Sequence, residues 1–122
     1  MITFDNMNVQ VVTASVSAGQ TTATVSLFSC TSNRRKKALV GLLSLEAAGK
    51  VVIQIASGGS QLLPAIYFAA KGTLYLGEVI GEVTSNQGIE AVITLDSAAA
   101  GSGVGFQAGI KVVSEKVDLA GA

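Results

Sequence analysis

The chain has 122 residues, carries eight basic and eight acidic side chains, and contains no histidine. Its length allows one domain with one hydrophobic core, and its net charge of zero provides no overall field that would attract nucleic acid or an anionic membrane. Charged residues make up only 13% of the chain, so we expect partner subunits to cover part of the surface, the alternative being a monomer coated with uncharged polar residues.

The predicted elements are β-strands, because apolar and polar residues alternate along much of the chain. At the start the alternation is weak: Val12, Ala14 and Val16 would line one face, so residues 1–20 are either a first strand or an arm that orders only against a neighbouring subunit. Further on, clear strands are predicted at residues 22–28, 38–45, 51–56, 89–95 and 104–112.

Glycine-rich and polar turns separate these strands, which together predict an all-β fold. We expect a single-domain antiparallel β-sandwich, jelly-roll-like, with about eight strands. It would occupy residues 21–113 and be followed by a C-terminal tail at 114–122, which has little apolar content. Pro64 cannot donate to a sheet ladder, so the run 62–68 either starts late or lies on an edge.

The chain offers few groups for catalysis or metal binding. Without histidine it has no Ser–His or Cys–His pair, and its single cysteine excludes the usual zinc sites. Glu78 and Glu82 would share a face if their run is extended, but the simpler interpretation, which we adopt, is two solvated strand residues. The glycines of residues 101–105 lack the spacing of a dinucleotide loop and predict a tight turn. We expect no catalytic residues, no cofactor and no metal.

Cys30 follows a predicted strand and has two interpretations. A single thiol is most often a small buried apolar group. Arg34 and Arg35 lie close in sequence, and the alternative is that they lower its pKa. The first residues lack the features of a signal peptide, and the longest apolar stretch is too short to span a bilayer, so we expect no membrane partner.

Four of the eight basic residues form one block, Arg34, Arg35, Lys36 and Lys37. Four adjacent like charges require solvent or an acidic partner. Nucleic-acid binding would need further basic residues and stacking aromatics, and Phe28 is the nearest aromatic, so we expect no nucleic-acid partner. Two interpretations remain: docking onto an acidic protein surface, and a solvated turn that leads into the next strand.

Residues 37–113 carry a family likeness, in the runs "KVVIQIASGGSQLLPAIYFAAKGTLYL" (50–76) and "TSNQGIEAVITLDSAAAGSGVGFQAGIKV" (84–112). These runs resemble small β-sandwich proteins of tailed phages, which include head decoration (cement) proteins and some head-fibre or tail-fibre tips. The resemblance implies a non-enzymatic homotrimer on the outer capsid surface of the virion, assembled in the host cytoplasm and bridging subunits of the major capsid protein. The alternative is a fibre tip that recognises a host glycan or protein receptor. The basic block lies outside the best part of the match, and its docking to the capsid is our own hypothesis.

Overall fold

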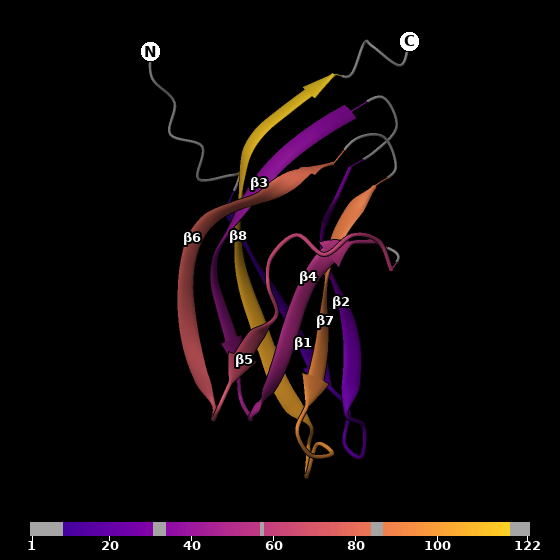
Figure 1. Cartoon of the computed structure of the whole chain (residues 1–122), viewed down its shortest axis with the longest axis vertical. Helices are drawn as coiled ribbons and strands as arrows, with labels where there is room; N and C mark the ends of the chain where they lie inside the picture. The colour runs from indigo at the N-terminus through magenta and orange to yellow at the C-terminus, as the bar shows by residue number, and fades with distance from the viewer. Residues whose placement is uncertain (1–8, 31–33, 57, 84–86, 118–122) are drawn as a thin grey trace.

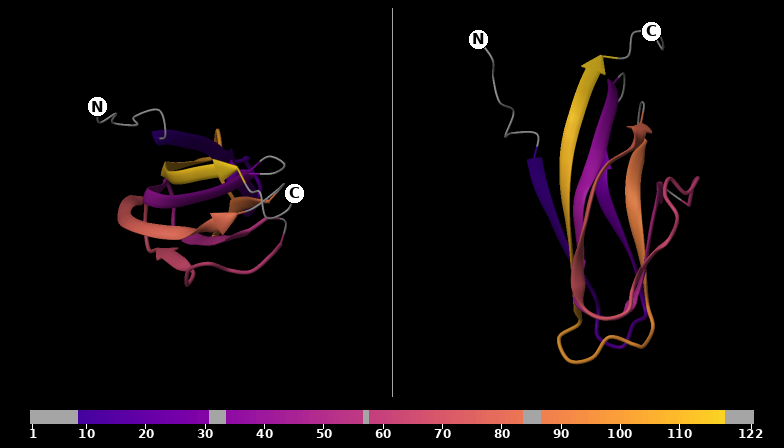
Figure 2. Two further views of the ribbon diagram at one scale, coloured as in Figure 1. Left: turned by 90° about the horizontal axis from the view of Figure 1, so that it is seen from above. Right: turned by 60° about the vertical axis from the view of Figure 1, so that its left-hand side comes forward.

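The structure is a computed structural model that describes residues 9–30, 34–56, 58–83 and 87–117. Eight antiparallel strands form two four-stranded sheets that pack against each other (Figures 1 and 2). Among the described residues there is no helix with the length and apolarity of a bilayer span. The strands are β1 (Val9–Val16), β2 (Thr22–Ser29), β3 (Arg34–Leu45), β4 (Gly49–Ile55), β5 (Ile66–Phe68), β6 (Gly72–Val83), β7 (Gly88–Leu95) and β8 (Val104–Val117).

The order of the strands is that of a jelly roll. Sheet A has the order β1-β8-β3-β6, and sheet B has the order β2-β7-β4-β5. Every strand of the first half of the chain therefore pairs with a strand of the second half: β1 with β8, β2 with β7, β3 with β6 and β4 with β5. The chain is one long hairpin folded over two sheets, which confirms the predicted jelly-roll-like sandwich.

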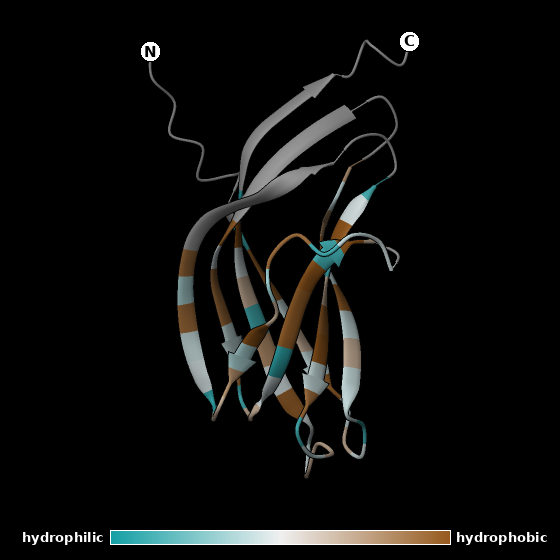
Figure 3. Ribbon diagram, viewed as in Figure 1, coloured by the Kyte–Doolittle hydropathy of each residue, from teal (hydrophilic) through white to brown (hydrophobic). Residues whose placement is uncertain are grey.

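The core lies between the two sheets and uses the faces that the alternation predicts. On β7 the buried positions include Ile89, Ala91 and Ile93, and on β8 they include Phe106 and Ile110. In Figure 3 most of β7 has apolar colours, and the coloured part of β8 alternates between apolar and polar colours. The largest fully buried side chains of the described residues are Phe106, Leu27, Leu43, Leu45, Ile53, Ile89, Ile93, Ile110, Val16, Val40 and Val51.

Two irregularities modify the simple alternation. The register of β2 against β7 shifts between Ser26 and Phe28, and this bulge allows Leu27 and Phe28 to be buried although they are adjacent. The register of β3 shifts between Val40 and Leu42, so Val40 and Leu43 both face the core. This second shift moves the buried positions of β3 from even numbers (Val40) to odd numbers (Leu43 and Leu45), so the run 38–45 is apolar at nearly every position.

The ends of the domain differ from the predicted boundaries. Residues 9–16 pair with β8 of the same chain and form a first strand, whereas the start of the predicted arm, residues 1–8, lies outside the described residues. Strand β8 continues to Val117, past the expected end of the sandwich at residue 113, because β3 pairs with it over this whole length. Only residues 118–122 of the expected tail lie outside the described part.

The predictions for the segment around Pro64 and for the turn at residues 101–105 agree with the structure. Strand β5 begins after Pro64 and lies at the edge of sheet B, as the missing donor requires. The predicted turn at residues 101–105 is confirmed: Gly101 and Gly103 have positive φ angles, and β8 begins at Val104. Strand β6 is the element that no alternation predicted, and it forms the edge of sheet A.

Candidate functional site

The basic block of Arg34, Arg35, Lys36 and Lys37 forms the first part of strand β3. Strand β3 lies between β8 and β6, so the block belongs to a central strand. The predicted turn context is therefore wrong, and the reason is that β8 extends far enough to pair with all four residues. The structure describes the backbone of the block, whereas its side chains lie outside the described part.

The register places acidic residues opposite the two lysines. Lys36 is paired with Glu115 of β8, and Lys37 is paired with Glu82 of β6. Opposite charges at directly paired positions of an antiparallel sheet stabilise each other. Half of the block therefore has acidic residues of the same chain at neighbouring register positions, which reduces its need for an external acidic partner.

The two arginines have different neighbours. Arg34 is paired with Val117 and Arg35 with Lys116, both on β8. This end of sheet A therefore places a further basic residue beside the arginines. Among the four predicted docking residues, Arg34 and Arg35 are the better candidates for an external partner.

The thiol of Cys30 lies in the hydrophobic core and is only 4% exposed. The backbone N–H of Cys30 donates to the carbonyl of Gln87, at 2.8 Å. The interpretation as a small buried apolar group is confirmed. The side chains of Arg34 and Arg35, on which the alternative depends, lie outside the described part, as do those of Glu78 and Glu82.

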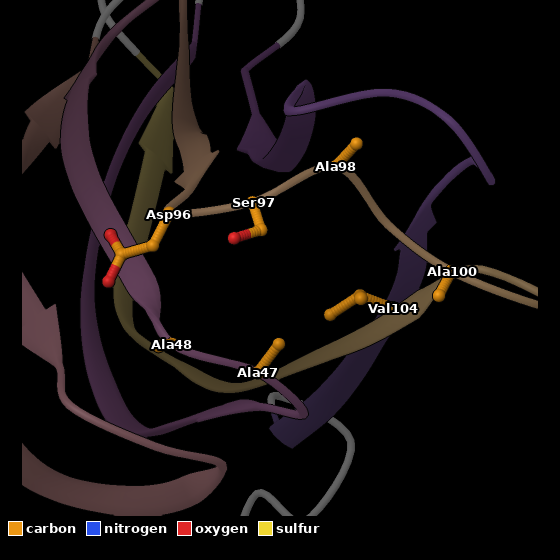
Figure 4. Close-up of a pocket in the computed structure, with 7 residues that line it drawn as sticks. All are labelled: Ala47, Ala48, Asp96, Ser97, Ala98, Ala100 and Val104. Carbon is orange, nitrogen blue, oxygen red and sulfur yellow. The ribbon is translucent and has the colours of Figure 1, made fainter.

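A hollow of about 270 Å³ lies where the β3–β4 turn meets the β7–β8 connection (Figure 4). In Figure 4 the Ser97 side chain points into the hollow, and the Asp96 carboxylate lies at the end away from Val104. Asp96 is the only titratable side chain in this lining. In the described part of the chain no three potential metal ligands lie together. The lining residues are Ala47, Ala48, Asp96, Ser97, Ala98, Ala100 and Val104.

The carboxylate of Glu90 is the one buried charged group among the described residues, with 8% exposure. It accepts a hydrogen bond from the Gln54 amide at 2.6 Å and another from the backbone N–H of Gly58 at 3.1 Å. The alternation places Glu90 on the outer face of sheet B, and the β4–β5 connection covers it there. Its role is to hold this connection against the sheet.

We expect Glu90→Ala to destabilise the fold by about 1.5–3 kcal/mol, because it leaves the Gln54 amide and the Gly58 N–H without their acceptor. Thr94→Ala, on the outer face of the same strand, is the matched control and should change stability by less than about 0.5 kcal/mol. Urea unfolding followed by circular dichroism measures both. Limited proteolysis should cut the β4–β5 connection faster in Glu90→Ala, and equal unfolding midpoints for the two variants would contradict the assigned role.

Among the side chains that the structure describes, the outer face of sheet A has few charges. One row across the four strands consists of Val11, Gly109, Leu42 and Tyr75, and the paired strands bring them into line. Val11 is 66% exposed and Tyr75 is 78% exposed. Glu46 lies over Gly105 at one end of this surface. We call this surface the sheet A face; its residues are Val11, Thr13, Ser15, Leu42, Ser44, Glu46, Thr73, Tyr75, Gly105, Gln107 and Gly109.

Further exposed apolar side chains lie where the two sheets end. Because β1 lies against β2, with the Gln10 amide bonded to the Leu27 carbonyl, the edge strands β5 and β6 form the opposite side of the sandwich. Tyr67 of β5 is 76% exposed, and Leu74 of β6 is 40% exposed. We call this surface the β5–β6 edge; its residues are Tyr67, Ala69, Ala70, Lys71 and Leu74.

Sequence reasoning did not identify either surface. The alternation of the sequence does not predict β6. It therefore does not show that Tyr67 lies on the edge strand of sheet B and Tyr75 on the edge strand of sheet A. Three of the four most exposed large apolar side chains of the described residues belong to β5 and β6, namely Tyr67, Leu74 and Tyr75. These surfaces, with the arginine end of β3, are the candidate functional sites.

Neither a protein-family model nor a curated protein matches this sequence.

Proposed function

We propose that the chain is a structural protein of a tailed-phage virion, which decorates the outer surface of the capsid and bridges subunits of the major capsid protein. The observation that carries this proposal is the sheet A face, which is broad, low in charge and contains the exposed side chains of Val11 and Tyr75. Exposed large apolar side chains on a surface with few charges favour association with another protein. The resemblance of residues 37–113 to phage decoration proteins supplies the capsid as the partner.

The proposed mechanism is stabilisation by mass action. A protein that binds the assembled shell, and does not bind free subunits, shifts the equilibrium toward the shell. An oligomer, for which the resemblance implies a trimer, would contact several capsid subunits at once, so that individually weak contacts are sufficient. Such a function requires no catalytic group and no cofactor.

The test is co-sedimentation of the purified chain with capsids that lack it, from the phage whose genome encodes it. We expect binding and a higher melting temperature of the capsid. Arg34→Ser/Arg35→Ser should weaken binding and reduce its dependence on salt, because exposed charge pairs are screened over about 8 Å at physiological ionic strength. Lys36→Ser/Lys37→Ser is the matched control and should have the smaller effect, since acidic residues stand at paired positions.

Two outcomes would count against these assignments. Capsids that neither bind the chain nor gain thermal stability would refute the decoration function. Binding that is the same for both double variants at low and high salt would refute docking through the basic block and leave the decoration function standing.

A second candidate is a fibre tip that recognises a host glycan, and the position of Tyr67 favours it. The phenol ring is 76% exposed on sheet B and is paired in register with Lys50, which in turn is paired with Thr94. An exposed aromatic ring beside an ammonium group and a hydroxyl offers a stacking surface with hydrogen-bonding groups. Copy number separates the candidates: many copies over the shell indicate decoration, and a few at a fibre end indicate recognition.

A further inference from the structure

The outer face of sheet B carries one continuous row of polar and aromatic residues across all four strands. Tyr67 of β5 is paired with Lys50 of β4, and Lys50 is paired with Thr94 of β7. Thr94 in turn is paired with Thr22 of β2. Directly paired residues of antiparallel strands point to the same face, so these four side chains are neighbours. With strands about 4.8 Å apart, the row is roughly 14 Å long, which is enough for a ligand of more than one ring.

The four side chains are accessible and chemically different. We call them the sheet B row. Tyr67, at one end, is 76% exposed. Thr22, at the other end, is exposed as well, and Lys50 and Thr94 between them are half-buried. A phenol ring offers a flat apolar surface, and a threonine hydroxyl both donates and accepts hydrogen bonds. Since a sugar ring has an apolar C–H face and a rim of hydroxyls, the sheet B row has the chemistry to bind a sugar chain.

The Lys50 ammonium group is the only charge in the sheet B row. Its paired neighbours are uncharged, and within the described part of the chain it forms no ion pair. Of the described carboxylates of this sheet, that of Glu90 is bonded to Gln54 and Gly58. The other, Asp96, follows the end of β7 and lies at the hollow of Figure 4. A ligand with a negative group would therefore supply the charge that matches Lys50.

We propose that the sheet B row binds a glycan whose sugars carry a carboxylate, as uronic and sialic acids do. The ring of Tyr67 stacks on one sugar, the Lys50 ammonium group binds the carboxylate, and the threonine hydroxyls bind the hydroxyls of the next sugar. This inference rests on the second candidate function, glycan recognition, and gives it a ligand class.

An acidic glycan uses all four side chains, whereas other anionic ligands use fewer of them. A nucleic acid is bound through several phosphates, each of which needs a cation, and the sheet B row has one. The carboxylate of an acidic peptide can bind Lys50, but the peptide lacks the dense hydroxyls that match Thr94 and Thr22. A neutral glycan leaves the charge of Lys50 without a partner.

The sheet B row is separate from the sheet A face, because the outer faces of the two sheets lie on opposite sides of the sandwich (Figure 2). A chain that docks on a capsid through the sheet A face keeps the sheet B row free and turned away from the capsid. Glycan binding and decoration are therefore compatible in one molecule.

The experiment is isothermal titration calorimetry of the full chain with trigalacturonic acid and with its methyl ester. Esterification removes the charge and keeps the rings and their hydroxyls. We expect the acid to bind at least about tenfold more tightly than the ester, the effect of one charge-assisted hydrogen bond. Added salt should reduce this difference. Sialyllactose and lactose form a second pair, which shows whether a sialic acid or a uronic acid is the source of the carboxylate.

Variants locate the site. Lys50→Met keeps most of the apolar stem, so it should weaken binding of the acid at least about tenfold and leave the ester unchanged. Lys71→Met, at an exposed lysine outside the row, is the matched control and should change neither. Tyr67→Ala should weaken both ligands about tenfold, because the stacking surface is lost. Tyr75→Ala, at the exposed tyrosine of the sheet A face, should weaken neither, and circular dichroism should show a folded chain in each case.

The outcomes separate this inference from the functions on which it bears. Equal affinity for the charged and uncharged member of both pairs would overturn the acidic class and leave glycan recognition standing. No binding of any of the four sugars would refute the site and the glycan candidate together, and leave the decoration function to the capsid test. Equal losses in Lys50→Met and Lys71→Met, or triglutamate binding as tightly as trigalacturonic acid, would also overturn the proposal.

Discussion

Replacement of Phe106 by alanine should lower the free energy of unfolding by about 3–5 kcal/mol, the largest effect that we expect from a single truncation. Phe106 is 1% exposed and lies on the inner face of β8, paired with Leu45 of β3 and Ala14 of β1. Loss of the ring removes transfer free energy and leaves a cavity between the sheets. Since whole domains are stable by only about 5–15 kcal/mol, this change removes a large part of the total.

Phe106→Leu is the matched control, because it keeps most of the buried volume. We expect a cost of less than about 1.5 kcal/mol. Urea unfolding followed by circular dichroism should be carried out at one protein concentration, since assembly would add to the apparent stability. If Phe106→Ala and Phe106→Leu unfold at the same urea concentration, Phe106 does not occupy the centre of the core.

Gly103→Ala should cost at least about 2 kcal/mol, because two independent effects act at this position. The φ angle of Gly103 is 99°, which side-chain-bearing residues rarely adopt. A β-carbon built there would also lie 2.6 Å from the carbonyl oxygen of Val16, at the end of β1. The turn before β8 must therefore move away from β1, or the β1–β8 ladder must open at this end.

Gly101→Ala separates the two effects. Gly101 has a positive φ of 59°, but no atom lies within 4 Å of the position of an added β-carbon. It should therefore cost only the conformational term, about 1–2 kcal/mol. Thermal unfolding of both variants measures the difference, and a Gly101→Ala variant as unstable as Gly103→Ala would show that contact with Val16 is unimportant.

The sequence predicts the fold well where one face of a strand is buried and the other is open. In β7 and the first half of β8 the buried apolar residues fall at every second position, so both strands and their buried faces could be predicted. A jelly roll pairs the first strand with the last and the second with the second-to-last, so the expected fold also predicts the pairing of β1 with β8 and of β2 with β7. In β2 the bulge buries two adjacent residues, Leu27 and Phe28, which simple alternation cannot anticipate.

Edge strand β6 shows where this reasoning ends. It has exposed apolar residues, Leu74 and Tyr75, at consecutive positions, because an edge strand is open on its side as well as its outer face. Its sequence therefore lacks a clear period of two, and the surfaces that depend on it could not be predicted. The sequence also places the start of β3 too late, at residue 38, because four adjacent basic residues are typical of a turn. These residues belong to the strand because β8 is long enough to pair with them.

Glu90 is a third case, because its environment depends on residues distant in sequence. Period-two alternation places it correctly on the outer face of sheet B, where a carboxylate is expected to meet solvent. The β4–β5 connection folds back over it, and the Gly58 N–H provides a donor. Nothing near Glu90 in the sequence indicates this cover, so its burial could be found only from the three-dimensional structure.

The nested pairing of the strands has a consequence for how the protein is made. Strand β1 pairs only with β8, and β2 pairs only with β7, so the first strands to leave the ribosome are the last to find partners. Contacts between residues so far apart in the chain fold slowly, and unpaired strand edges favour aggregation in the meantime. Sheet A can therefore close only after β8 has been synthesised, and β1 has to wait for this last strand of the sandwich.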